Sequence, residues 1–171
     1  MVDISDIQNY FSDVSVDNGN SGKTIYNHAE KATLKSDGGS DIYNEKSNTV
    51  IKTGTGGTNI NVHNDYAVIS NTTIEASGGN NNIYIDAGTW IDDTLQVGDN
   101  VKIKTGAGDD TVELNYAENV TVDGGTGNDT IKGNGRADWV SVNGGDGNDY
   151  IELQTYGHYD ERHRFRRFNQ Q

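Results

Sequence analysis

Three aspartates stand at matching places in three short glycine-rich segments, a pattern that suits a hard cation. The segments are Thr105-Gly-Ala-Gly-Asp-Asp-Thr-Val-Glu113, Gly124-Gly-Thr-Gly-Asn-Asp-Thr-Ile-Lys132 and Gly144-Gly-Asp-Gly-Asn-Asp-Tyr-Ile-Glu152. The aspartates supply charge, and glycines at alternate positions allow positive φ angles, so that carbonyl oxygens of a tight turn can point at a common centre. Calcium prefers several oxygen ligands of both kinds. The candidate ligands are Gly106, Gly108, Asp109, Asp110, Gly125, Gly127, Asn128, Asp129, Gly145, Gly147, Asn148 and Asp149.

A short run of strand-forming residues follows each of these glycine-rich turns, which predicts that turns and strands alternate. The apolar residue of each run is Val112, Ile131 or Ile151. The interval between successive copies is the length of a whole solenoid coil rather than of one nonapeptide. Only one turn of each coil carries the motif, since residues 115–119 and 133–138 lack it. We therefore expect one calcium-binding edge and one plain edge.

The three segments resemble the G-G-x-G-x-D-x-U-x repeat of the hemolysin-type (RTX) calcium-binding family, with Thr105 in place of the first glycine of the first copy. The resemblance covers residues 105–153. It implies a parallel β-roll with calcium between successive turns. It also implies a module of a secreted or cell-surface bacterial protein, exported by type I secretion, that folds on binding calcium after export. A C-terminal flanking segment that promotes this folding is a further implication.

The apolar residues of the N-terminal half recur at nearly constant steps of eight or nine, at Val16, Ile25, Leu34, Ile42, Ile51, Ile60 and Ile69. Two such steps close one coil. The pattern predicts an all-β fold, a right-handed parallel β-roll or β-solenoid of about seven coils of 17–20 residues. Metal-free turns are expected in this half, where Lys23, Ser40, Thr58 and Asn81 stand near the positions of the aspartates.

Both ends of the chain are predicted to cap the roll, which spans residues 14–155. Residues 1–13 place Ile4, Ile7, Tyr10 and Phe11 on one face of a helix. Residues 156–171 hold four arginines against Asp160 and Glu161, and we expect this basic segment to cover the last coil. The spacing of the apolar residues becomes irregular between residues 71 and 100. A loop or extra strand pair is expected there, with Trp90 as a hydrophobic plug in preference to an exposed binding side chain.

The amino-acid composition limits the kinds of binding partner that this chain can have. The net charge of -13 disfavours nucleic acid and anionic membrane surfaces and favours cations. No apolar stretch approaches the ~20 residues of a membrane span, so none is expected. The 22 glycines, with no proline and no cysteine, fit a turn-rich repeat without disulfides.

The sequence does not indicate an enzyme. It contains no G-x-S-x-G elbow, and the pair Asp92-Asp93 lies in the irregular region. The alternative is a binding module on the same scaffold, either polysaccharide-binding or an ice-binding adhesin region, with a polysaccharide or another surface protein as partner. An ice-binding row of threonines is disfavoured, because the third motif position reads Ala107, Thr126 and Asp146.

Overall fold

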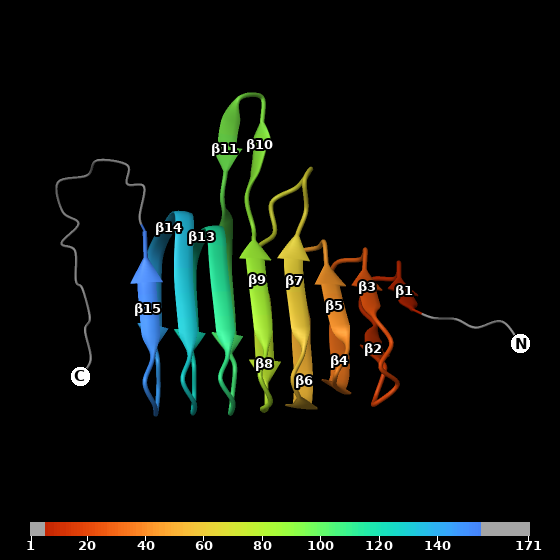
Figure 1. Ribbon diagram of the computed structural model, residues 1–171. Coiled ribbons are helices and arrows are strands. Elements are labelled where there is room, and N and C mark those ends of the chain that lie inside the picture. Colours follow the sequence, from red (N-terminus) through yellow and green to blue (C-terminus); the bar gives the residue numbers. More distant parts are fainter. Residues whose placement is uncertain (1–5, 155–171) are drawn as a thin grey trace, which may run out of the picture.

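The computed structural model describes residues 6–154, apart from the side chains of 136–138, and shows a parallel β-solenoid of about eight turns (Figure 1). One face is formed by β1 (Ile7–Asn9), β3 (Ile25–Asn27), β5 (Asp41–Asn44), β7 (Asn59–His63), β9 (Asn82–Asp86) and β15 (Tyr150–Leu153). The other is formed by β2 (Ser15–Asp17), β4 (Thr33–Gly38), β6 (Val50–Gly56), β8 (Thr72–Ala76) and β12 (Gly98–Lys104). The long strands β13 (Thr111–Asp123) and β14 (Thr130–Asn143) turn a corner and belong to both.

The core consists of apolar side chains stacked in register from coil to coil. One column contains Ile25, Ile42, Ile60, Ile83, Val112 and Ile131, and the facing column contains Leu34, Ile51, Ile74, Ile103 and Val122, all buried. The predicted periodicity is therefore confirmed up to Ile60. Ile74, and not Ile69, pairs with Ile51 in β6, although Ile69 is also buried.

The first strand corrects two predictions. The predicted helix over residues 1–13 is wrong in its described part, because Ile7–Asn9 is a strand that pairs in parallel with β3. Backbone hydrogen bonds to the open edge of β3, together with a buried bond from Asn9 Nδ2 to Asn27 Oδ1 at 2.6 Å, outweigh the helical pattern. Tyr10 and Phe11 are exposed. The extra strand raises the number of coils from about seven to about eight.

Residues 1–5 and the predicted basic cap at 156–171 lie outside the described residues. Within residues 6–154 the structure contains no helix long and apolar enough to cross a membrane.

Two coils are longer than the sequence predicts. Ile60 pairs with Ile83, and Ile83 in turn pairs with Val112. The coil from Ile60 to Ile83 is therefore long, and the coil from Ile83 to Val112 is longer still. The longer coil holds an antiparallel hairpin of β10 (Thr89–Ile91) and β11 (Thr94–Gln96), so that, of the two expected alternatives, a loop or an extra strand pair, the structure has the strand pair. The hairpin projects from the edge opposite the glycine turns (Figure 1).

That plain edge has its own repeated feature, a residue with positive φ at the same register position in successive coils. The residues are Asp13, Lys31, Asn48, Asn71, Asn100, Asn119 and Trp139. Asparagine suits this conformation. Asn71 Nδ2 donates to Asn48 Oδ1 at 3.1 Å, and Asn100 Nδ2 donates to Asn71 Oδ1 at 2.8 Å, so these side chains link neighbouring coils without metal.

Candidate metal centre

The three predicted turns stack directly on one another at the other edge of the solenoid. Their third residues Ala107, Thr126 and Asp146 form parallel bridges. Gly108 N donates to Thr126 O at 2.9 Å, and Gly127 N donates to Asp146 O at 2.8 Å. The structure thus brings together the candidate ligands that the sequence separates by whole coils.

The predicted positive φ angles are confirmed at Gly106, Gly108, Gly125, Gly127, Gly145 and Gly147, with values from 88° to 139°. These turns also leave no room for side chains. A Cβ on Gly127 would collide with Gly108 O, and a Cβ on Gly147 would collide with Gly127 O. Glycine is therefore required both by the backbone conformation and by the close approach of carbonyls from the preceding turn.

The motif aspartates form a ladder that uses one carboxylate oxygen each. Asp129 Oδ1 accepts from Asp110 N at 2.9 Å, and Asp149 Oδ1 accepts from Asp129 N at 3.0 Å. Asp110 and Asp129 are only 2% and 1% exposed, and the Oδ2 atom of each is buried without a hydrogen-bond partner. A buried carboxylate oxygen without a partner is costly, so these two atoms point to a cation.

Asp129 Oδ2 shares its surroundings with a carbonyl of the next turn. A Cβ built on Gly124 would lie 2.5 Å from Asp129 Oδ2 and closer still to Gly144 O. Two oxygens from successive turns therefore lie beside the same glycine. This pairing of carboxylate and carbonyl oxygens fits the ligand preference of calcium.

The electrostatics of the ladder favour a bound cation. Burial raises the pKa of Asp129 to about 6, the hydrogen bond from Asp110 N opposes the rise, and the charges of Asp110 and Asp149 add to it. Burial likewise raises the pKa of Asp110. Among the described side chains, no lysine, arginine or histidine forms an ion pair with these aspartates.

Proton linkage gives the direction in which the folding stability changes with pH. The folded pKa of Asp129 lies above its ordinary value of 3.8, so the native chain binds more protons than the unfolded chain between pH 3.8 and about 6. Stability of the calcium-free protein therefore falls as the pH rises through this window. At neutral pH the carboxylate form of Asp129 opposes folding unless a cation balances it.

The fifth motif residues form a second ladder on the exposed side of the turns. Asp109 N bonds to Asn80 Oδ1 at 3.0 Å, and Asp109 Oδ1 accepts from Asn128 N at 2.7 Å. Asn128 Oδ1 in turn accepts from Asn148 N at 3.0 Å. Of the predicted ligands, these three residues thus place their side chains toward solvent, and only their carbonyls remain candidates.

The N-terminal coils place uncharged or basic side chains at the aspartate position, as the sequence predicts. Strand register aligns Lys23, Ser40, Thr58 and Asn81 with Asp110, Asp129 and Asp149. Asn81 Oδ1 accepts from Thr58 N of the preceding coil at 3.1 Å, just as Asp129 Oδ1 and Asp149 Oδ1 accept from the coil before theirs. Within residues 6–154 no three histidine, cysteine, aspartate or glutamate side chains converge on one point. Any metal would depend on single carboxylates and backbone carbonyls.

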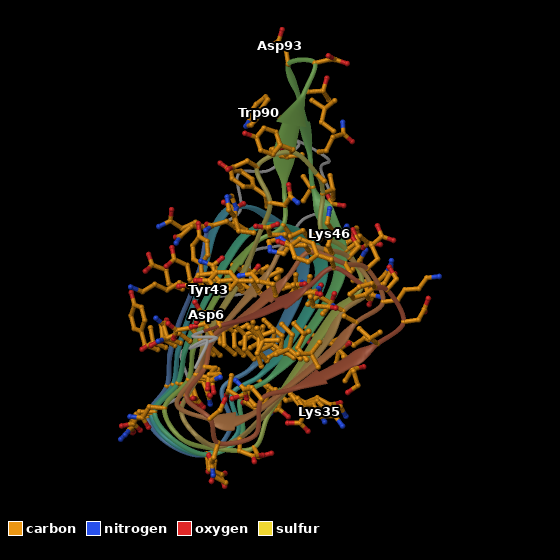
Figure 2. All side chains as sticks on the ribbon, turned by 90° about the vertical axis from the view of Figure 1, so that its right-hand side faces the viewer. Asp6, Lys35, Tyr43, Lys46, Trp90 and Asp93 are labelled. Atoms are coloured by element: carbon orange, nitrogen blue, oxygen red, sulfur yellow. The ribbon has the colours of Figure 1, made fainter. Side chains whose placement is uncertain are left out.

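The opposite edge carries the hairpin and an open cavity of about 240 Å³ lined by His63, Asp65, Asp86, Trp90, Leu95 and Tyr116, among others. The predicted role of Trp90 as a plug is wrong, because its side chain is 66% exposed. Figure 2 shows Trp90 and Asp93 on the hairpin, outside the body of the solenoid. The hairpin projects away from the core, so there is no interior for Trp90 to fill.

Comparison with family models, curated proteins and solved structures finds no match to this chain.

Proposed function

We propose that this protein is a calcium-binding β-solenoid module in which cations between the glycine turns hold the C-terminal coils together. The observation that carries the proposal is the buried, unpartnered Oδ2 atom of Asp129 beside Gly144 O. A hard divalent cation would bind both oxygens and balance charge that the described side chains leave unpaired. Asp149 and carbonyls of the glycine turns would supply further ligands.

In such a module, folding depends on the calcium concentration around the protein. The ligands come together only in the folded coil, so the free energy of calcium binding becomes free energy of folding. The repeat sequence resembles modules that fold after export, and this coupling suits a secreted or cell-surface bacterial protein. The chain would then act as a structural, non-catalytic part of its parent protein.

Isothermal titration calorimetry with calcium tests the proposal. Replacing Asp129 by asparagine removes a charged ligand and should weaken binding roughly 100-fold, because charged ligands largely set the affinity of calcium sites. Asp99→Asn is the matched control, since it makes the same charge change at an exposed position at the start of β12, on the plain edge. Binding to the unaltered protein should also weaken below about pH 6, where Asp129 takes up a proton. Equal affinities for the two variants would contradict the assignment.

A second candidate function, sugar binding, is favoured by the plain edge. Six of the exposed large apolar side chains lie along that edge, from the first coil to the coil of β14, and Trp90 is the one that lines the cavity; the six are Tyr10, Phe11, Tyr66, Trp90, Ile91 and Trp139. In the cavity beside Trp90, His63 Nε2 lies 2.9 Å from Asp65 Oδ1, and Asp86 Oδ1 is buried without a partner. An aromatic face beside hydrogen-bond acceptors suits a sugar ring, and the acidic lining favours a neutral sugar over a uronate.

Trp90→Ala tests this second function. Affinity for neutral hexose oligosaccharides, measured against a uronate oligosaccharide, should fall roughly tenfold when the stacking surface is lost. Trp139→Ala is the control, because Trp139 is 70% exposed on the same edge but does not line the cavity. Binding that is absent in the unaltered protein, or lost equally in both variants, would exclude a sugar site at the hairpin.

A further inference from the structure

Thr105 is the last side chain in a column of inward-facing residues that runs along the glycine edge. Strand register places Asn18, Ser36, Thr53, Ala76, Thr105, Gly124 and Gly144 in this column. Thr105 is fully buried. The first of the three glycine turns therefore keeps a side chain where the second and third have none.

The Thr105 side chain occupies the space between the first and second turns. Its Oγ1 donates to Gly124 O at 2.5 Å. The hydroxyl also lies close enough to the Asp110 carboxyl group to oppose the burial that raises the pKa of that group. A hydroxyl carries one hydrogen, and Gly124 O receives it, which leaves Asp110 Oδ2 without a donated bond.

The next space along the ladder is different. Gly124 has no side chain to place between Asp129 Oδ2 and Gly144 O, although both oxygens lie beside its Cα. In both spaces the side-chain position of the column residue thus lies beside an aspartate carboxyl group and a carbonyl of the next turn. A threonine hydroxyl fills the first, and no side chain of the column fills the second.

Asn81 adds to this difference by balancing the first aspartate. Asp110 Oδ1 accepts from Asn81 N at 2.6 Å and from Asn81 Nδ2 at 2.9 Å, and Nδ2 also lies 3.1 Å from Thr105 O. Within the described residues, Asp129 Oδ1 accepts only from Asp110 N. Asp110 therefore has more hydrogen-bond donors around it than Asp129, and a cation is needed less there.

We infer that Thr105 closes the space between the first and second turns to calcium, so that the complete calcium site lies between the second and third turns. The inference rests on the proposed function. The hydroxyl group donates a hydrogen bond to Gly124 O, which a cation would otherwise contact. The Cβ and methyl group of Thr105 fill the space that the cation would need. Thr105 thereby marks the boundary between the metal-free coils and the calcium-binding coils.

Calorimetric titration of Thr105→Gly and Thr105→Val with calcium tests the inference. The glycine variant opens the space and should bind one calcium ion more than the unaltered protein. The valine variant keeps the volume without the hydroxyl, and its stoichiometry should be unchanged. Hydrogen exchange at the Asn81 amide supplies a second measurement, because calcium should slow this exchange in the glycine variant alone.

Two results would overturn the inference. One is an unchanged stoichiometry in a folded Thr105→Gly variant, and the other is loss of a calcium ion in Thr105→Val, which would make the hydroxyl a ligand. Loss of a calcium ion in Thr105→Val would overturn the inference even if the glycine variant does not fold. If the unaltered protein binds no calcium, the proposed function itself fails, which separates that failure from failure of the role of Thr105.

Discussion

Removal of calcium should expose the amides of β13 to β15 to hydrogen exchange while those of β3 to β7 stay protected. In the C-terminal coils Asp110, Asp129 and Asp149 stack without a described cationic partner, and without calcium their repulsion opposes the fold. A ligand at 100 times its Kd stabilises the folded state by about 2.7 kcal/mol, so protection should fall about 100-fold on chelation. Hydrogen exchange followed by mass spectrometry measures both halves in one sample.

The N-terminal coils serve as the internal control in this experiment. Ser40, Thr58 and Asn81 stand at the aspartate positions, so calcium has no charge to balance there. Equal loss of protection in both halves would show that the solenoid unfolds as one cooperative unit. No loss in either half would show that the glycine turns are purely structural, and the calcium proposal would be abandoned.

Gly127→Ala should be strongly destabilising, because it adds a methyl group in the middle one of the three stacked glycine turns. Gly127 has a φ of 131°, and the added Cβ would collide with the backbone oxygen of Gly108, which cannot move without separating two turns. We expect a loss of roughly 3 kcal/mol in the free energy of unfolding, from the unfavourable φ together with the clash. Chemical denaturation in saturating calcium measures it.

Gly22→Ala provides the matched control for this substitution. Gly22 also has a positive φ, of 68°, but no atom lies within 4 Å of the position of an added Cβ. Gly22→Ala should lower the free energy of unfolding by about 1 kcal/mol, because only the unfavourable backbone conformation opposes it. Similar losses for the two variants would mean that the close stacking of the turns does not contribute to stability.

The repeats and the apolar periodicity were sufficient to predict the solenoid and the stacking of the glycine turns. Val112 and Ile131, which stand at the same place in successive repeats, do pair, as a coil of that length requires. Only the coarse fold could be obtained in this way. The two longer coils differ from the others in their loops on the plain edge, and the break in apolar spacing located an insertion there without giving the length of either coil.

Two local errors have a physical origin in contacts that are distant in sequence. The helical pattern of residues 1–13 was a sound local signal, but the open edge of β3 offers Ile7–Asn9 backbone partners. The role of Thr105 was also missed, since a departure from a glycine motif does not reveal that its hydroxyl reaches Gly124 O. The column of Ser36 and Thr53 is a signal that could have indicated an inward-facing hydroxyl at Thr105 once the register was known.

A crystal structure of the protein in saturating calcium, with anomalous data to identify the ion, would show directly whether calcium binds between the glycine turns. We expect a calcium ion between the second and third turns, about 2.3–2.6 Å from Asp129 Oδ2 and from Gly144 O. An edge without bound calcium, or calcium bound only at Asp65 and Asp86 beside the hairpin, would contradict it.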